Sequence, residues 1–466
     1  MDSRSSSLSD LGVDDLRGND ERVDRIMNKY EPVIGLEVHV ELNTKSKMFC
    51  RCSADYFGKE PNTHTCPVCL GLPGALPYIN EQAINDCIKI GLALNCKISK
   101  ISLFERKNYF YPDLPKGYQI SQYRWPLCVN GWINVEGKDG EEVKIRINRA
   151  HQEEDTGKLT HKGADTLIDF NRSGVPLVEI VTEPDFRDVA EIRDYAKKLQ
   201  QLFRYLGVSN ADMERGDMRL EANVSVRPEG TEGLPNYRVE LKNINSFRFM
   251  VAAVEYEIKR QTEAHDAGEK LSLETRGWDE DKKCTYLQRS KEEAHDYRYF
   301  PEPDLREIRI DTSDVEKLQV QLPELPRVKG NRFEEKYSLS KQQAVILTES
   351  RQLAAFFEEA VKDGKDHGLE AKTVANYIIN RKINIKEVLP AQVVIEIRDR
   401  GMGVIEDLGE LEKMAKEAVE ENPRVVEDYQ KGKKTAIQAL IGSVMKKSQG
   451  KAEPEKIKKI LERLLK

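Results

Sequence analysis

Four side chains that can bind a cation or move a proton fall within five positions, in the stretch Asn148-Arg-Ala-His-Gln-Glu-Glu-Asp-Thr-Gly-Lys. They are His151, Glu153, Glu154 and Asp155. Imidazole and carboxylate groups serve as metal ligands and as general acids or bases. The alternative is a solvated acidic turn, because runs of charge usually lie on solvent-exposed surface.

A second group of the same kind lies in residues 33–42, Val-Ile-Gly-Leu-Glu-Val-His-Val-Glu-Leu. Apolar and polar residues alternate there, which predicts a strand with Glu37, His39 and Glu41 on one face. A half-buried strand with a solvated outer face would show the same alternation. A histidine between two carboxylates is nevertheless an unusual choice for solvation alone, so both interpretations stay open from this strand by itself.

The elements that must position these groups are mostly strands. Alternation predicts strands ending near residue 147 and at 219–227 and 237–243, and a hairpin of strands 166–170 and 177–182 around a turn at 171–174. Helices are predicted at 80–94, 189–206 and 247–261. Several of the strands carry a polar face with Glu, Lys, Arg or Asn. In one antiparallel sheet they would form a charged concave floor, which suits Mg²⁺ and phosphoryl transfer.

Other motifs narrow the chemistry. There is no G-x-x-x-x-G-K-[ST], so the chain is not a P-loop enzyme. Residues 104–132 interleave aromatic, amide and basic side chains with Pro and Gly, which suits stacking on a base and contacting phosphates. A surface loop rich in proline is the alternative for that segment. Residues 289–304 are also dense in functional side chains.

Four of the eight cysteines form two close pairs, Cys50-Arg-Cys52 and Cys66-Pro-Val-Cys69. Two such pairs can supply four thiolates in a tetrahedral array with no vacant position, which predicts a structural zinc site. The alternative is four reduced thiols in neighbouring loops. The other four cysteines are scattered and are expected to be ordinary reduced residues.

Length and charge predict several parts. We expect an α+β protein of 466 residues with a mobile N-terminal extension over residues 1–30 and an antiparallel-sheet domain over 31–325. A helical domain over 326–398 and a basic tail domain over 399–466 follow. The net charge is −6, but residues 431–466 carry eleven Lys and Arg against three Glu, which predicts RNA binding by the tail. No apolar run approaches the roughly 18–20 residues of a membrane span, so we expect a cytoplasmic protein.

Seven segments, in this order, carry a resemblance that covers the chain from about residue 31 onward. They are Gly35-Leu-Glu-Val-His-Val-Glu-Leu, Cys66-Pro-Val-Cys-Leu-Gly-Leu-Pro-Gly-Ala-Leu-Pro, Lys107-Asn-Tyr-Phe-Tyr-Pro-Asp-Leu-Pro-Lys-Gly-Tyr-Gln-Ile-Ser-Gln, His151-Gln-Glu-Glu-Asp-Thr-Gly-Lys, Asp169-Phe-Asn-Arg-Ser-Gly-Val-Pro-Leu-Val-Glu-Ile-Val-Thr-Glu-Pro, Val239-Glu-Leu-Lys-Asn-Ile-Asn-Ser-Phe and Ala294-His-Asp-Tyr-Arg-Tyr-Phe-Pro-Glu-Pro-Asp. Together they closely resemble the B-subunit family of the glutamyl/aspartyl-tRNA(Gln/Asn) amidotransferases. The tail is similar to the tRNA-binding tail of the family, except that Glu453 stands where we expect Asn.

The resemblance implies a fold and a reaction. The fold would be a cradle-shaped kinase domain on an antiparallel sheet, followed by a helical domain and a tail. ATP and Mg²⁺ would convert the side-chain carboxylate of Glu on glutamine tRNA, or of Asp on asparagine tRNA, into an acyl phosphate. Ammonia released from glutamine by the amidase (A) subunit would displace the phosphate. The small C subunit would hold the other two together in a heterotrimer.

Candidate site residues follow from the motif positions. Those for the chemistry are Glu37, His39, His151, Glu153, Glu154 and Glu240, of which Glu37, His39 and Glu154 are the expected Mg²⁺ ligands. Those for steadying phosphates are Lys107, Arg172 and Lys242. One alternative is a tRNA-binding scaffold that has lost catalysis, although the intact acidic clusters argue against it. The other is the related archaeal subunit, whose large inserted domain would find no room in this chain.

Overall fold

The computed structural model describes residues 29–290, 296–401, 408–448, 452 and 454–465. The expected extension over residues 1–30 therefore lies outside the described residues, apart from its last two. The chain forms two compact units, which meet in the sequence between Leu325 and Pro326. Each unit is described by itself.

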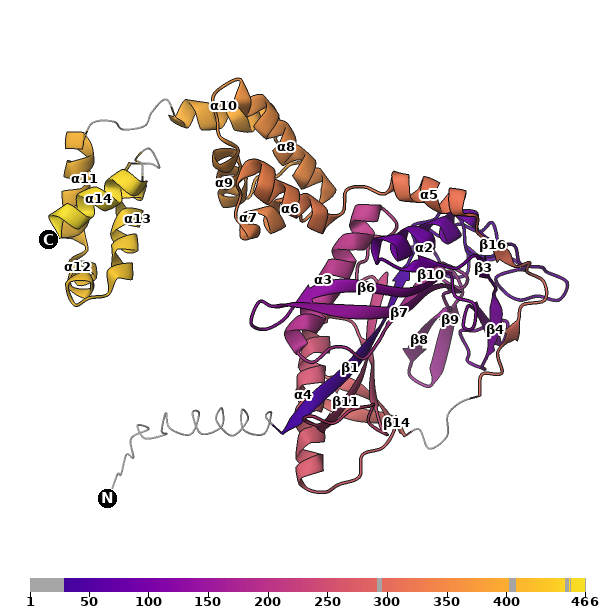
Figure 1. Cartoon of the computed structure of the whole chain (residues 1–466). Coiled ribbons are helices and arrows are strands. Elements are labelled where there is room, and N and C mark those ends of the chain that lie inside the picture. Colours follow the sequence, from indigo (N-terminus) through magenta and orange to yellow (C-terminus); the bar gives the residue numbers. More distant parts are fainter. Residues whose placement is uncertain (1–28, 291–295, 402–407, 449–451, 453, 466) are drawn as a thin grey trace, which may run out of the picture. The chain divides into compact units, whose positions relative to one another are not determined.

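A nine-stranded sheet organises the first unit, in the order β14-β13-β12-β11-β1-β10-β7-β6-β2 (Figure 1). In chain order its strands are β1 (Tyr30–Glu41), β2 (Lys97–Ile98), β6 (Cys128–Glu136), β7 (Glu142–Glu154), β10 (Pro176–Thr182), β11 (Met218–Pro228), β12 (Val239–Ile244), β13 (Glu274–Asp279) and β14 (Cys284–Ser290). Three small sheets accompany it: β15 (Phe300–Pro301) with β4 (Glu105–Asn108) and β5 (Tyr118–Ser121), β16 (Ile308–Arg309) with β3 (Ile101–Ser102), and β8 (Lys158–Lys162) with β9 (Asp165–Asp169).

The prediction of a purely antiparallel sheet is wrong at one pair of strands. All neighbouring strands of the large sheet run antiparallel except β12 and β13, which are parallel. Helix α4 (Phe247–Asp266) connects these two strands. A crossover of this kind returns the chain to the same end of the sheet, so the second strand runs parallel to the first. The unit is therefore α+β with a mixed sheet.

One face of the sheet is buried under helices α2 (Glu81–Ala93), α3 (Val189–Leu206) and α4. Figure 1 shows α3 and α4 along this face, with β4, β8 and β9 beyond the other. The apolar residues of β1, Leu36, Val38 and Val40, lie in this core, where each buried side chain contributes about 1.5–3 kcal/mol. Period-2 alternation therefore sends Glu37 and His39 to the opposite face.

The predicted ends of α2 and α3 are confirmed by their capping, whereas α4 continues to Asp266, beyond its predicted end at residue 261. Asn80 caps α2, with its side chain accepting a hydrogen bond from the backbone of Ala83. Helix α3 begins with a capping box made by Asp188 and Glu191 and ends at Gly207, whose φ of 71° suits a residue without a Cβ.

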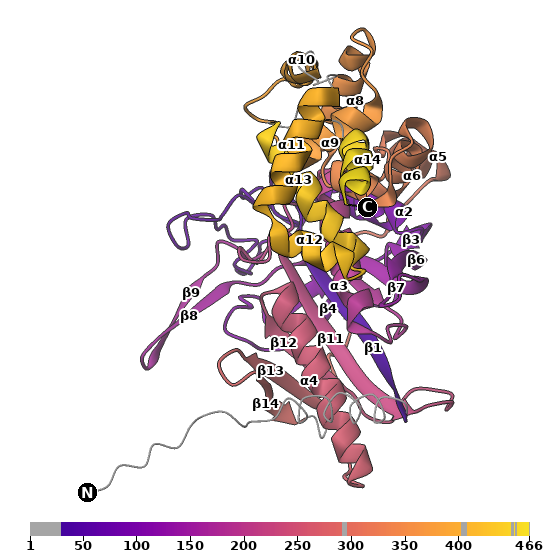
Figure 2. The same ribbon diagram turned by 90° about the vertical axis from the view of Figure 1, so that its left-hand side faces the viewer.

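The predicted hairpin of strands 166–170 and 177–182 is wrong. β9 pairs with β8, whereas β10 lies between β1 and β7 in the large sheet. Gly163, with a φ of 61°, lies in the two-residue connection between β8 and β9, which is the tight turn that makes a hairpin. This hairpin projects from the rest of the unit (Figure 2). The chain after β9 turns instead against the loop that holds the clustered cysteines, where Asn171 Oδ1 accepts from the backbone N–H of His64 at 2.7 Å.

The second unit consists of helices around two apolar clusters. The first cluster draws on α6 (Pro326–Tyr337), α7 (Lys341–Leu347), α8 (Arg351–Lys365), α9 (Ala371–Arg381) and α10 (Pro390–Gly401). The second draws on α11 (Leu408–Glu421), α12 (Pro423–Gln430), α13 (Ile437–Lys447) and α14 (Pro454–Leu464). The predicted capping box of Ser340 and Gln343 is confirmed at α7. Among the described residues, no helix combines the length and apolar character needed to span a membrane.

Candidate functional site

A row of ionisable side chains crosses four strands on the face of the large sheet that the helices do not cover. Strand pairing aligns His39 of β1 with Glu179 of β10, and Glu179 with His151 of β7. On its other side, His39 is aligned with Arg219 of β11. The two acidic stretches of the sequence therefore meet through β10, which lies between their strands.

The centre of this row is a group of the half-buried His39 and the buried His151, Glu153 and Glu179, here called the floor cluster. Glu179 Oε2 lies 3.2 Å from His151 Nε2 and 3.8 Å from His39 Nε2. His151 Nε2 is also 3.4 Å from Glu153 Oε1. One ligand atom from each of His39, Glu153 and Glu179 lies within 4.8 Å of the others, so this imidazole and these two carboxylates can hold one metal ion.

The members of the floor cluster shift one another's pKa. Burial raises the pKa of Glu179, but His151, together with His39 and Lys107, holds it well below its usual range. Burial lowers the pKa of His151, whereas the carboxylates of Glu179 and Glu153 raise it above the ordinary value. Burial and Glu179 raise the pKa of Glu153, yet its bond to His151 and the charge of Lys107 bring it below normal. Buried but ionised carboxylates are the state that binds a divalent cation.

Glu37 lies beside the floor cluster on β1. Its Oε1 accepts a hydrogen bond from Asn223 Nδ2 at 3.0 Å. Burial, followed by the negative charges of Glu179 and Glu221, raises the pKa of Glu37. The carboxyl of Glu37 therefore takes up a proton more readily than the ionised carboxylates of the floor cluster.

Glu240 and Lys242 form a separate group on β12. Lys242 Nζ lies 2.9 Å from Glu221 and 2.9 Å from Glu240. Thr275 Oγ1 donates to the other oxygen of Glu240 at 3.1 Å. Both side chains are thus engaged with protein partners at the edge of the floor.

Glu154 points away from the floor cluster. Consecutive residues of a strand face opposite sides, so Glu154 cannot share the face of Glu153. Its carboxylate accepts from Lys116 Nζ at 2.5 Å and from the backbone N–H of Ile120 at 2.9 Å. The structure therefore gives Glu154 a buried ion pair with Lys116.

The structure gathers a different set of possible Mg²⁺ ligands from the one expected from the sequence. The expected set was Glu37, His39 and Glu154, whereas the described ligand atoms that come together belong to His39, Glu153 and Glu179. Sequence reasoning left Glu179 out. Glu179 could have been recognised as the single carboxylate in an otherwise apolar strand, because a buried carboxylate requires a polar or charged partner.

Asp155 belongs to a second group, here called the paired cluster, which consists of the buried Glu41 and Asp155 and the partly buried Arg172 and Arg219. Asp155 Oδ2 lies 2.7 Å from Arg219 Nη2 and 3.8 Å from Arg172 Nε. Burial raises the pKa of Asp155, but the two guanidinium groups lower it far below normal. Burial and the charge of Asp155 raise the pKa of Glu41, to which Tyr56 Oη donates at 3.0 Å. Arg172 also donates to two backbone carbonyls of the turn after β7, at 2.9 Å each.

Lys107 of β4 lies above the floor among aromatic rings. Its Nζ is 5.2 Å from the centre of the Tyr297 ring and 5.8 Å from that of Tyr109. Burial lowers the pKa of Lys107, but the nearby Glu153 carboxylate, then the Tyr299 hydroxyl, raise it above the usual value. The ammonium is therefore charged and close to the floor cluster.

The clustered cysteines also come together. The sulfur atoms of Cys50, Cys52, Cys66 and Cys69 all lie within 4.8 Å of one another. A hydrogen bond from Cys50 lowers the pKa of Cys69 to about 5, with burial acting in the opposite sense. The buried Lys47 Nζ lies 3.8 Å from Cys69 Sγ. Four sulfur donors so placed can hold a metal ion, and the Lys47 ammonium lies beside them.

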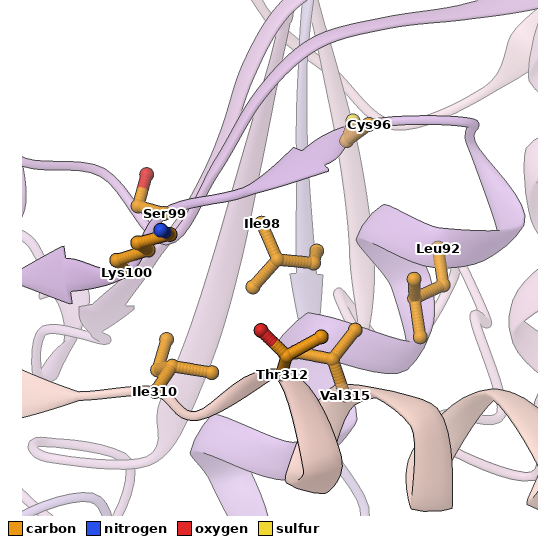
Figure 3. Close-up of a pocket in the computed structure, with 8 residues that line it drawn as sticks. All are labelled: Leu92, Cys96, Ile98, Ser99, Lys100, Ile310, Thr312 and Val315. Atoms are coloured by element: carbon orange, nitrogen blue, oxygen red, sulfur yellow. The ribbon is translucent and has the colours of Figure 1, made fainter.

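Two small hollows in the described part of the chain lie outside this polar face. One has a volume of about 240 Å³, and Figure 3 shows Ile98 and Leu92 on one side of it, with Ile310 and Val315 on the other. The other, of about 280 Å³, is lined by Phe110 and its neighbours. No carboxylate or histidine lines either hollow, so neither offers the chemistry of the floor cluster.

Two family models match the chain. One, described as the GatB/GatE catalytic domain, matches residues 32–316, and one described as the GatB domain matches residues 382–465. The sheet unit therefore belongs to the GatB/GatE class of catalytic domains.

Curated relatives give the family within that class. The chain is 44% identical to the B subunit of the aspartyl/glutamyl-tRNA(Asn/Gln) amidotransferase of Carboxydothermus hydrogenoformans, over 93% of this chain and 98% of the relative. It is 46% identical to the protein of the same name from Thermotoga neapolitana, over 94% and 99%. The corresponding protein of Brevibacillus brevis is 45% identical over 94% and 99%. The chain belongs to the B-subunit family of the aspartyl/glutamyl-tRNA(Asn/Gln) amidotransferases, which confirms the resemblance seen in its sequence.

Proposed function

We propose that this chain is the part of a tRNA-dependent amidotransferase that activates the side-chain carboxylate of a misacylated residue. Its substrate is Glu on glutamine tRNA, Asp on asparagine tRNA, or both. The floor cluster is the observation that carries the proposal, because one histidine and two ionised carboxylates that can hold a metal ion lie together on one rigid sheet. Family membership supports the same reaction class.

The chemistry requires activation because a carboxylate has no good leaving group. A substrate carboxylate oxygen attacks the γ-phosphorus of ATP, ADP leaves, and an acyl phosphate results. Ammonia then attacks the acyl carbon, phosphate leaves, and the nitrogen loses a proton to give the amide. Ammonia comes from the amidase (A) subunit, and the small C subunit joins the amidase and this chain in a heterotrimer.

The residues of the floor fit Mg²⁺. We assign His39, Glu153 and Glu179 to hold the cation, because their ligand atoms lie within 4.8 Å of one another. When bound, Mg²⁺ offsets the repulsion between the substrate carboxylate and the triphosphate. His151 orients Glu179 through their 3.2 Å contact, and Lys107 steadies the transferred phosphate. Arg172 and Lys242 are engaged by protein carboxylates, so we assign them to the framework.

The experiment compares wild type with Glu179→Gln in the purified heterotrimer. We expect tRNA-dependent ATP hydrolysis to fall about 100-fold or more, because a ligand to the charge-stabilising cation is lost. Glutamine hydrolysis without tRNA should continue, because that chemistry belongs to the amidase. Glu229→Gln, an exposed carboxylate just after β11, is the matched control. A wild-type heterotrimer that amidates tRNA without consuming ATP would refute the proposal, as would full activity of Glu179→Gln.

We further propose that the four clustered cysteines hold one structural Zn²⁺. Four sulfur donors leave no open position, and the Lys47 ammonium offsets part of the thiolate charge. Elemental analysis should find about one zinc per chain, and Cys66→Ser should remove it. Absence of zinc from protein purified without chelator would rule this out.

The tail is proposed to contact tRNA. Its lysines are not equivalent, because acidic residues of α11 offset some of them. Lys447 Nζ lies 2.7 Å from Glu421 and 3.2 Å from Glu417. On α14, Lys458 and Lys459 have no carboxylate partner among the described residues, which leaves them available to phosphates.

A further inference from the structure

Arg149 differs from Arg219 and Lys242, two other basic residues on the polar face of the sheet. Within the described part of the chain, no carboxylate lies within ion-pair distance of its guanidinium. Nη1 donates to Asn148 Oδ1 at 3.3 Å, and the buried Nε has no hydrogen-bond partner. A buried N–H without an acceptor costs about 1–3 kcal/mol, so this arrangement calls for an explanation.

A β-bulge directs Arg149 onto this face. Arg149 pairs with Val181 and Ile147 pairs with Thr182, so the pairing with β10 skips Asn148. Ile147 and Ala150 accordingly both point into the helical core, although they are three residues apart. In an uninterrupted strand Arg149 would share the apolar face of Ile147. The bulge turns it to the side of the floor cluster, as bulges beside functional sites do.

The surroundings of Arg149 hold its guanidinium next to the floor. The residue is two positions along β7 from His151, a spacing of about 7 Å in a strand. Its Cζ lies 5.7 Å from the centre of the Tyr123 ring, and that ring stacks on Tyr299 at 4.7 Å between centres. Across the sheet, Arg149 aligns with Val181, and Val181 aligns with Glu37. The aromatic stack therefore supports one side of a guanidinium that faces the polar floor.

Two of the neighbouring cations are already engaged by carboxylates. Arg219 lies 2.7 Å from Asp155, and Lys242 lies 2.9 Å from each of two carboxylates. Guanidinium groups remain charged at all relevant pH values, and their forked N–H groups match two oxygens of a phosphate. Unlike those two side chains, Arg149 keeps donors that can bind an anion.

We propose that Arg149 binds a phosphate group of the nucleotide that is used at the floor cluster. This rests on the proposed function, since it assigns a ligand to the same site. A phosphate of the tRNA backbone would offer the same chemistry. Glu153, a member of the proposed metal-binding set, lies four positions further along β7. This favours the triphosphate, because a cation held there would offset the charge of its phosphates.

The test uses the heterotrimer with Arg149→Gln, which removes the charge, and Arg149→Lys, which keeps the charge but loses the fork. Arg146→Gln is the matched control: it lies on the same strand but pairs with Asp185 at the surface, at 2.6 Å. The Michaelis constants for ATP and for misacylated tRNA are measured separately, together with kcat. We expect the KM for ATP to rise about 10-fold or more in Arg149→Gln and less in Arg149→Lys. The KM for tRNA and the behaviour of Arg146→Gln should stay unchanged.

Each outcome decides the assignment. A raised KM for tRNA with an unchanged KM for ATP would move Arg149 to the RNA backbone and overturn it. Unchanged constants in a folded Arg149→Gln heterotrimer would also overturn it, while the proposed function would stand if wild type still hydrolyses ATP. If Arg149→Gln does not assemble, Arg149→Lys decides, and wild-type kinetics in that variant would count against the proposal. A wild-type heterotrimer without tRNA-dependent ATP hydrolysis would remove both the function and this assignment.

Discussion

Two buried acidic groups lie side by side on the same sheet, and their partners differ in kind. In the paired cluster, Asp155 faces the guanidinium groups of Arg172 and Arg219. In the floor cluster, the basic partners of Glu179 are the imidazoles of His39 and His151. A guanidinium cannot give up its proton, whereas an imidazole can exchange its proton for a metal ion.

This difference separates framework from site. The paired cluster is electrostatically complete, and Arg172 also holds the backbone turn after β7. The floor cluster combines imidazoles with ionised carboxylates, so a divalent cation can replace protons there. Composition does not distinguish the two groups, since both are rich in acidic and basic residues; the identity of the base does.

The largest expected effect on activity comes from replacing one of two adjacent carboxylates on β7, Glu153 or Glu154, by an amide. Glu153→Gln should lower tRNA-dependent ATP hydrolysis about 1000-fold, equivalent to about 4 kcal/mol of barrier, because it removes one of the proposed metal ligands. The same substitution should weaken Mn²⁺ binding. This binding is measured from the electron paramagnetic resonance signal of the free ion. Glu154→Gln should bind Mn²⁺ as wild type does, because its carboxylate faces Lys116. Equal loss of Mn²⁺ binding in both variants would contradict the comparison.

The next effect concerns the paired cluster. Asp155→Asn leaves two guanidinium groups without their shared carboxylate and should cost about 3 kcal/mol of stability. Urea unfolding of the sheet unit, followed by tryptophan fluorescence, measures the change. Mn²⁺ binding to the folded variant should persist. A stability loss below about 1 kcal/mol would show that the arginines find other partners.

The distinction between basic residues that are paired with carboxylates and those that are not also predicts different roles for the lysines of the tail. Replacing Lys458 and Lys459 together by Gln should raise the KM for tRNA about 3-fold to 10-fold, because phosphate neutralisation dominates affinity for RNA. Lys447→Gln should have a smaller effect, since two glutamates already neutralise that lysine. The difference between these two effects on the KM for tRNA should become smaller at higher salt concentration. A larger effect from Lys447→Gln would reverse the assignment.

The smallest expected effect concerns an ion pair between an arginine and a glutamate at the surface of the helical unit. Arg332 Nη1 lies 2.6 Å from Glu358 Oε1, and 31% and 28% of the two side chains are exposed. The hydrogen bond from Arg332 lowers the pKa of Glu358. The pair therefore stabilises the fold at pH values above the pKa of the unfolded chain, about 4.3. This stabilisation is lost as the pH falls through the lower pKa of the folded protein.

Glu358→Gln should therefore cost about 0.5–1 kcal/mol at neutral pH, a value reduced by solvent screening. At a pH of about 3 or lower the cost should shrink, because the wild-type carboxylate is then becoming protonated as well. Urea unfolding at the two pH values measures it. A cost that does not change with pH would mean that the pair acts through packing.

Much of the local structure could be predicted from the sequence because its causes are local. The alternation of residues 33–42 places Glu37 and His39 on one face of β1. The caps at Asn80 and Ser340 follow from side chains that bond their own helix ends. The spacing of the cysteines predicts a group of four sulfur atoms, and the structure brings them together.

Tertiary structure decided which of these side chains meet. Strand register is set by pairing between segments far apart in the chain, and it is this register that brings Glu179 between His39 and His151. Period 2 separates Glu153 from Glu154, but only the position of β7 in the sheet decides which of them faces the floor. The bulge that turns Arg149 towards the site likewise arises from a mismatch between two strands, and neither strand carries that information alone.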